Sequence, residues 1–276
     1  MKRFLVLGIC LLMATSAFAQ QQFITIATGG TAGTYFPLGG ALADIWNKNI
    51  PKMNATAQAT GASIANINLL KGGNVDVIFT QNDVASYSYN GTELLKDQAY
   101  KDLRGMACLY NETIQLVALE SSGIKTITDL KGKKVSVGAA GSGTEANARQ
   151  ILESAGLTYN DIKVQYLSFG ESASNMKDGN IDAAFNTAGI PTAAIQDLAV
   201  SKKMVLVPID GQVATKLMAK YPFYALQIVP AGTYQGQNQN VTTVAVKSML
   251  AVSSKLSGDL VYKMLETMYA NTDRLI

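Results

Sequence analysis

Two segments of the chain, residues 70–79 and 176–185, carry the same pattern. Their sequences, LKGGNVDVIF and MKDGNIDAAF, each predict a helix end, a glycine turn and a short buried strand. Glycine-rich loops at 30–34 and 140–144 precede these segments at similar distances, and each loop follows a strand-like run. A chain of 276 residues that repeats strand, glycine loop, helix, helix, turn and strand is expected to form two α/β lobes of similar plan.

Apolar residues recur at helical spacing after each glycine loop. Residues 37–46 and 63–70 in the first half, and 144–155 in the second, each place apolar side chains on one helical face. A further amphipathic segment at 257–268 has no counterpart in the repeat. We therefore expect this last helix to fold back onto the first lobe.

Strand-like segments near residues 113 and 225 are expected to connect the lobes. Lobe I would comprise residues 20–112 and 226–276, and lobe II residues 113–225. Two crossings leave the lobes free to hinge about few residues. A ligand cleft between two similar α/β domains is the predicted consequence.

The first 19 residues have the pattern of a secretory signal peptide. Lys2 and Arg3 precede an apolar run at 4–13 and a small-x-small site at 17–19. The apolar run is shorter than the roughly 20 residues of a spanning helix. We expect a periplasmic protein whose first mature residue is Gln20.

Composition excludes several classes of protein. The chain has no histidine, so it cannot form a Ser-His-Asp triad, a Cys-His dyad or a histidine metal site. Its formal charge of +3 falls to +1 without Lys2 and Arg3, which gives no indication of nucleic-acid or membrane binding. Cys108 is the one cysteine outside the leader and is expected to be a buried thiol. We expect no enzymatic activity, no cofactor and no metal, and a monomer as the default state.

The two glycine loops, at 28–35 and 140–145, are candidate anion sites. Glycine lets the backbone approach a ligand closely, and the helix that follows offers N–H donors with partial positive charge. Tight turns with nothing bound are the alternative. No lysine follows the glycines as in a phosphate-binding P-loop, and the pattern at 138–143 lacks the acid of a dinucleotide site. Two Ser-x-x-Lys spacings lack the accompanying motifs of penicillin-recognising enzymes.

Other polar groups follow the two repeat strands. Gln81 and Asp83 come after the first, and Asn186 ends the second, at the edge expected to face the cleft. A helix-capping role is an open alternative for all three. Tyr35 and Tyr224 are candidates to close an amphipathic pocket with a ring and a hydroxyl.

Five separated motifs resemble the TAXI family of solute receptors. They are TGGTAGTYFPLGG at 28–40, VGAAGSGTE at 137–145, YLSF at 166–169, FNTAGIP at 185–191 and PAGTY at 230–234. The resemblance implies a two-lobed periplasmic binding protein (type II-like). It further implies that the protein delivers a small carboxylate, of the glutamate, glutamine or 2-oxo dicarboxylate type, to the membrane subunits of a tripartite ATP-independent periplasmic (TRAP) transporter.

The resemblance also implies which residues line the ligand site. By motif match they are Gly30, Thr31, Tyr35, Gln81, Asp83, Ser142, Gly143, Thr144, Glu145, Asn186 and Thr187. We assign the ligand carboxylate to Ser142, Gly143 and Thr144, because a helix N-terminus favours an anion. Asp83 would take the ammonium group of an amino acid. The chain stops earlier than this family usually does, so a truncated C-terminus is expected.

Two other functions stay open at this point. An exported sensor subunit that hands its signal to a membrane receptor would need the same ligand site, and no residue separates it from a transport receptor. An exported hydrolase would have to act without histidine and without an evident metal cluster.

Overall fold

One mixed β-sheet runs through the molecule, which is known from a computed structural model that describes residues 21–275. The predicted signal peptide lies outside the described residues. The strands are β1 (Gln22–Ala27), β2 (Met53–Gln58), β3 (Val77–Gln81), β4 (Leu103–Leu119), β5 (Lys134–Ser136), β6 (Lys163–Gln165), β7 (Ala183–Ala188), β8 (Met204–Val207), β9 (Ala225–Val229) and β10 (Val241–Ser253).

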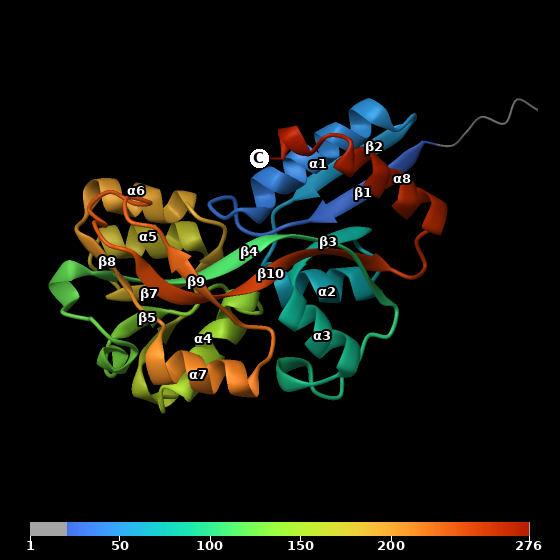
Figure 1. The fold of residues 1–276 in the computed structure, drawn as a ribbon. Helices are drawn as coiled ribbons and strands as arrows, with labels where there is room; N and C mark the ends of the chain where they lie inside the picture. The colour runs from blue at the N-terminus through green and yellow to red at the C-terminus, as the bar shows by residue number, and fades with distance from the viewer. Residues whose placement is uncertain (1–20, 276) are drawn as a thin grey trace, which may run out of the picture.

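Helices flank this sheet in both halves of the molecule (Figure 1). The α-helices are α1 (Tyr35–Asn49), α2 (Ser63–Lys71), α3 (Asn82–Asn90), α4 (Gly143–Ser154), α5 (Phe169–Lys177), α6 (Ala193–Ser201), α7 (Gly211–Lys220) and α8 (Gly258–Tyr269). Short 3-10 helices are η1 (Glu93–Leu95), η2 (Glu120–Ser122), η3 (Ile127–Leu130), η4 (Tyr159–Asp161) and η5 (Thr272–Arg274).

The strand order confirms the predicted duplication. In lobe I the order is β2-β1-β3, followed by the antiparallel strand β10 and then β4. In lobe II the order is β6-β5-β7, followed by the antiparallel strand β4 and then β8. In lobe I the long strand β10 therefore lies between β3 and β4. In lobe II the long strand β4 lies in the same way between β7 and β8. The fold is α/β with two similar lobes, as predicted.

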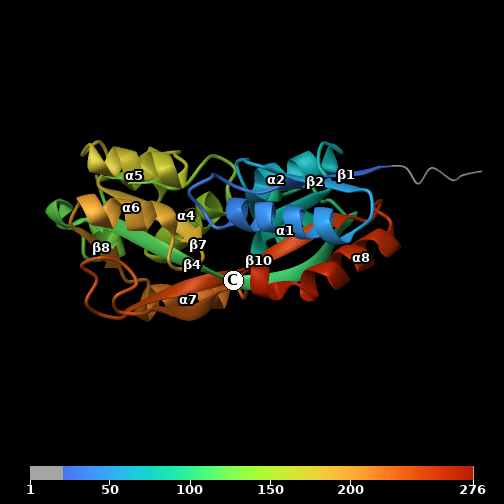
Figure 2. The ribbon, with the colours of Figure 1, turned by 90° about the horizontal axis from the view of Figure 1, so that it is seen from above.

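Two long strands, β4 and β10, run through both lobes (Figures 1 and 2). Along β4, Thr113 is paired both with β10 and with β7, so the strand exchanges neighbours there. The strand predicted near 225 is β9, which pairs with the first part of β10. The residue limits of the lobes, at 112/113 and 225/226, remain predictions.

The last helix packs on lobe I, as predicted. Helix α8 lies along α1 (Figure 1), and Trp46 of α1 is fully buried between them. The indole Nε1 of Trp46 donates a hydrogen bond of 3.0 Å to the carbonyl oxygen of Met264. A buried tryptophan needs such a partner, so this bond fixes the position of α8.

Cys108 is exposed, so the prediction of a buried thiol is wrong. It lies on β4 beside the buried Ala107, and successive strand residues face opposite sides. An apolar run in the sequence therefore contained one outward position. Within residues 21–275, none of the helices has the length and hydrophobicity needed to cross a bilayer.

Candidate functional site

A cavity of about 60 Å³ lies between the lobes. Lobe I contributes Gly29, Gly30, Gly33, Thr34, Tyr35, Thr60, Gly61, Ala62, Ser63 and Gln81, lobe II contributes Ala139, Ser142, Gly143, Thr144, Ser168, Phe169, Thr187 and Ala188, and β4 contributes Glu112. A cavity of this volume holds a few water molecules or a small solute.

Four helices begin at the wall of this cavity. The first residues of α1, α2, α4 and α5, which are Tyr35, Ser63, Gly143 and Phe169, all line it. The first N–H groups of a helix have no partner within the helix and carry partial positive charge. The cavity is therefore polarised for an anion without lysine or arginine among its described lining residues.

Seven of the twelve residues predicted from the sequence line this cavity. They are Gly30, Tyr35, Gln81, Ser142, Gly143, Thr144 and Thr187. The side chain of Ser142 caps α4 by accepting a hydrogen bond of 3.1 Å from the backbone N–H of Glu145. That contact holds the start of α4 against the cavity. The ligand-binding role of these residues remains a prediction.

Gly143 is required by the closeness of the lobes at this point. A Cβ atom on Gly143 would lie 2.2 Å from Oε1 of Gln81 and 2.7 Å from Oγ of Ser63. Both neighbours belong to lobe I, whereas Gly143 starts α4 in lobe II. The absent side chain therefore lets the two lobes meet beside the cavity.

Backbone groups also join the lobes directly. The carbonyl oxygen of Gly141 accepts hydrogen bonds from the N–H groups of Ile64 (3.1 Å) and Ala65 (3.2 Å), at the start of α2. On the other side, the N–H of Gly189 donates to Oγ1 of Thr34 at 3.0 Å. The second glycine loop thus caps a helix of the opposite lobe.

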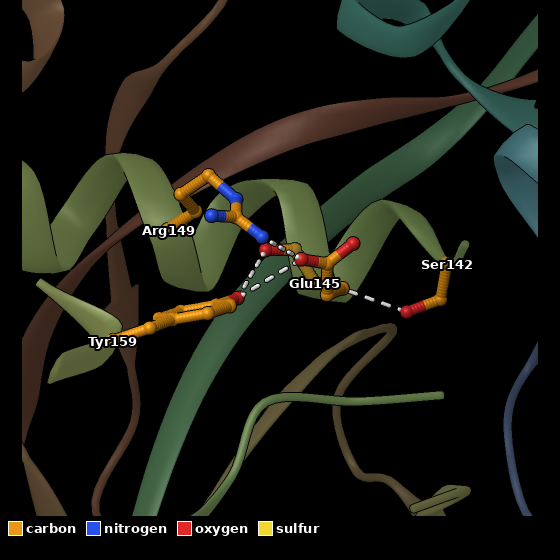
Figure 3. Close-up of polar contacts among 4 residues, drawn as sticks. All are labelled: Ser142, Glu145, Arg149 and Tyr159. Atoms are coloured by element: carbon orange, nitrogen blue, oxygen red, sulfur yellow. Dashed lines mark hydrogen bonds and ion pairs between the residues drawn. The ribbon is translucent and has the colours of Figure 1, made fainter. Parts of the chain in front are cut away.

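Three predicted residues point elsewhere. Thr31 is exposed on the first loop and does not line the cavity. Asn186 precedes Thr187 on β7 and faces the opposite side of the sheet, against α5 and α6. Glu145 turns along α4, where its carboxylate accepts hydrogen bonds from Arg149 (2.7 Å) and Tyr159 (3.2 Å), as Figure 3 shows.

Asp83 and Tyr224 lie in a buried polar network behind the cavity. Asn147 of α4 connects them, because its Nδ2 donates to Oδ2 of Asp83 (3.1 Å) and to the hydroxyl of Tyr224 (2.8 Å). The Oγ1 of Thr187 donates to Oδ1 of Asn147 at 3.1 Å, which links the network to the cavity wall. Burial raises the pKa of Asp83 to about 6. The hydroxyl of Tyr224 in turn donates to Gln150.

Glu112 lines the cavity and was not among the predicted residues. It is 2% exposed, and its carboxyl group accepts hydrogen bonds from the hydroxyls of Tyr35 (2.7 Å) and Tyr110 (3.0 Å). Burial raises the pKa of Glu112 to about 8, against the opposing effect of both tyrosine hydrogen bonds. The side chain is therefore mostly neutral at pH 7.

Sequence reasoning also missed the start of α5 as part of the cavity. Ser168 caps this helix, and Glu171 closes a capping box by accepting a hydrogen bond of 2.8 Å from the N–H of Ser168. The Ser-x-x-Glu spacing is a helix-start signal that can be recognised in the sequence alone. Among residues 21–275 no group of His, Cys, Asp and Glu is placed to hold a metal ion.

Comparison with known proteins supports the fold and identifies a family. A putative aliphatic sulfonates-binding protein of Escherichia coli (strain K12) is 33% identical over 121 residues, which are 44% of this chain and 33% of that protein. The match thus spans about a third of the length of that curated relative.

Solved structures share the fold. The periplasmic aliphatic sulphonate-binding protein of Escherichia coli aligns with a TM-score of 0.53 and 18% identity, over 93% of this chain and 77% of that one. A putative L-cystine ABC transporter protein of Listeria monocytogenes aligns with a TM-score of 0.58 and 19% identity, over 91% of both chains. The architecture is that of two-lobed solute-binding proteins.

These findings show that the predicted assignment to the TAXI family is wrong. The expectation of a TRAP transporter as partner depended on that assignment and is not supported. The relatives are named for aliphatic sulfonates and for ABC transport instead. Glycine loops that start helices recur wherever an α/β lobe binds a ligand at helix N-termini, so they do not separate one such family from another. Residues 26–276 match the family model described as NMT1-like, and the chain belongs to the NMT1-like family.

Proposed function

We propose that this protein is a non-catalytic, exported solute-binding protein that captures a small solute with one oxyanion group and delivers it to an ABC-type membrane transporter. The observation that carries the proposal is the convergence of four helix N-termini on one cavity between two lobes. Partial positive charge at these ends stabilises an anion where no cationic side chain is present. The related binding proteins support the transport role and a periplasmic location.

The oxyanion would bind at the start of α4. Ser142, Gly143 and Thr144 line the cavity there, and the first N–H groups of α4 lack partners within the helix. Carboxylates and sulfonates both present oxygens that accept from such donors. A 2-oxo dicarboxylate fits less well, because its second charge would find no lysine or arginine among the described lining residues.

Contacts between the lobes support capture by closure. The bonds from Ile64 and Ala65 to Gly141, and from Gly189 to Thr34, exist only when the lobes meet. A solute that touches both lobes adds to these contacts and shifts the population towards the closed state.

A thermal-shift assay with matched oxyanions tests the proposal. We would use taurine, ethanesulfonate, β-alanine and propionate, so that sulfonate and carboxylate are separated. A ligand at a hundred times its Kd adds about 2.7 kcal/mol to the free energy of unfolding, which raises Tm by about 5–10 °C for a chain of this size. A folded protein whose Tm responds to none of the four would overturn the proposed function.

A double variant locates the site. Ser142→Ala with Thr144→Ala removes two hydroxyls at the start of α4 and is expected to weaken oxyanion binding about tenfold or more. Losing the Ser142 cap also costs about 1 kcal/mol of stability. Thr158→Ala is the matched control, because Thr158 caps the exposed helix η4 in the same lobe and does not line the cavity. An unchanged affinity in the double variant would place the oxyanion elsewhere.

A further inference from the structure

One carboxyl group faces the cavity, and its surroundings set it apart from the other acids of the described chain. Glu112 is the single Asp or Glu among the described lining residues, and none of them is lysine or arginine. It extends from β4 beside Thr113, where this strand exchanges neighbours between the lobes. Glu112 thus lines the cavity at the strand that links the two lobes.

Two tyrosines hold the carboxyl group in one orientation. The hydroxyl of Tyr35, on α1, donates to Oε2 of Glu112 at 2.7 Å, and that of Tyr110, on β4 itself, donates to Oε1 at 3.0 Å. Burial raises the pKa of both hydroxyls well above the ordinary tyrosine value, so both stay protonated as donors. The other ionisable group that acts on Glu112 is Asp83 of α3, whose negative charge also favours the neutral form.

A second acceptor lines the same cavity. Gln81 is 2% exposed, and its Oε1 has no hydrogen-bond partner among the residues that the structure describes. Gln81 also helps to stabilise the ionised form of Glu112. A buried acceptor without a donor costs free energy, and a ligand that brings a donor recovers it.

The cavity therefore offers two kinds of contact. The start of α4 supplies donors for an oxyanion, and Glu112 with Gln81 supplies acceptors for a donor or a cation. We propose that Glu112, assisted by Gln81, selects solutes that carry an ammonium group beside the oxyanion, and that binding drives the proton of Glu112 into solvent. This inference rests on the proposed function and narrows its ligands to small zwitterions.

The proton balance follows from the charges. The unligated protein holds a proton on Glu112 at neutral pH, and an incoming ammonium group favours the carboxylate. The zwitterion keeps its own protons, so the released proton goes to the buffer. With a pKa of about 8 in the unligated protein, binding at pH 7 releases most of one proton. Affinity for a zwitterion then rises with pH until the unligated Glu112 is itself ionised.

Isothermal titration calorimetry at pH 7 in Bis-Tris and in Tris, two buffers without an oxyanion that differ in ionisation enthalpy, measures this proton release. The ligands are two pairs that differ by the ammonium group, taurine with ethanesulfonate and β-alanine with propionate. In at least one pair the zwitterion is expected to bind about tenfold tighter or more and to release close to one proton. Glu112→Gln should lose that preference and the proton release together.

Two further variants separate a specific role from a structural one. Tyr35→Phe removes one donor to the carboxylate, so the pH at which zwitterion affinity levels off should move upward. Glu153→Gln is the matched control, because Glu153 pairs with Lys220 on the exposed side of α4 and should change neither the preference nor the proton count.

The outcomes distinguish this proposal from the function on which it rests. Zwitterion binding without proton release, or equal affinity for both members of the pair that binds, would overturn the role of Glu112 and leave the binding function standing. Retention of the preference and of proton release in a folded Glu112→Gln variant would do the same. If no member of either pair binds the folded wild type, the proposed function fails and this inference fails with it.

Discussion

Gly143→Ala tests whether the lobes meet as closely as the structure places them. The new Cβ would lie 2.2 Å from Oε1 and 2.3 Å from Cδ of Gln81, and 2.7 Å from Oγ of Ser63. Real Cβ contacts are not this short, so either the side chain of Gln81 shifts or the lobes stay further apart. Gln81 lines the cavity, so a shift of its side chain would enter the space that the ligand occupies.

The variant should weaken binding without weakening the fold. Overpacking at a closely packed contact costs about 1–3 kcal/mol, and here it acts only on the state in which the lobes touch. That penalty corresponds to a loss of about 5- to 150-fold in affinity. Alanine also leaves the unfolded chain fewer conformations than glycine does, which stabilises the folded state by about 0.4–1 kcal/mol, so the free energy of unfolding should hold or rise.

Calorimetric titration and urea unfolding measure the two quantities separately. The titration would use whichever of taurine, ethanesulfonate, β-alanine or propionate binds the wild type. Gly40→Ala in α1 is the matched control, because no atom lies within 4 Å of its Cβ position. Gly40→Ala should also hold or raise the free energy of unfolding, with unchanged affinity. Wild-type affinity in Gly143→Ala would refute the close contact between α4 and Gln81.

Three further predictions concern stability. Glu112 binds its proton more tightly in the folded protein, where its pKa is about 8, than in the unfolded chain, where its pKa has the ordinary value of 4.5, so wild-type stability should fall from about pH 5 to pH 8. Urea midpoints should show a smaller fall in Glu112→Gln. Asn147→Ala removes the hydrogen-bond donor of the buried Asp83 and should lower the free energy of unfolding, measured with urea, by about 1–3 kcal/mol. An unchanged free energy of unfolding would show that this network does not stabilise the core. Trp46→Ala leaves a cavity between α1 and α8 and should lower the free energy of unfolding by about 3–5 kcal/mol in the same assay. Trp46→Phe should lower it less, because this change removes mainly the hydrogen bond to Met264.

Local sequence patterns were sufficient to predict the repeated plan. Glycine turns, apolar periods and short buried runs are determined by neighbouring residues, and they placed α1, α2, α4 and α8 within a few residues. The same local signals explain why seven of the predicted residues line the cavity. Each of them lies at the end of a strand, in the loop after it or at the start of a helix, and in an open α/β sheet these positions share one edge.

Contacts between distant segments were beyond the sequence. Glu112 is one acid in a long strand, and only the fold brings Tyr35 to it from the start of α1. Asp83 comes two residues after Gln81, the last residue of β3, yet it lies in the first turn of α3 and accepts a hydrogen bond from Asn147. Whether such residues cap a helix or contact a ligand depends on the direction of their side chains, which spacing alone does not give.

The mistaken family assignment has a related cause. Two of the quoted motifs, at 28–40 and 137–145, contain a glycine-rich loop before a helix, and any lobe of this kind needs such a loop, because it exposes helix N–H groups to a ligand whatever that ligand is. Selectivity for one ligand over another must come from side chains that add charge or hydrogen-bond acceptors beside these helix N-termini. In this cavity those side chains are Glu112 and Gln81, and Glu112 lies in no glycine motif. In this protein, discrimination between ligands is therefore better sought at strand residues that reach the cavity, Glu112 on β4 and Gln81 on β3, than in the glycine loops.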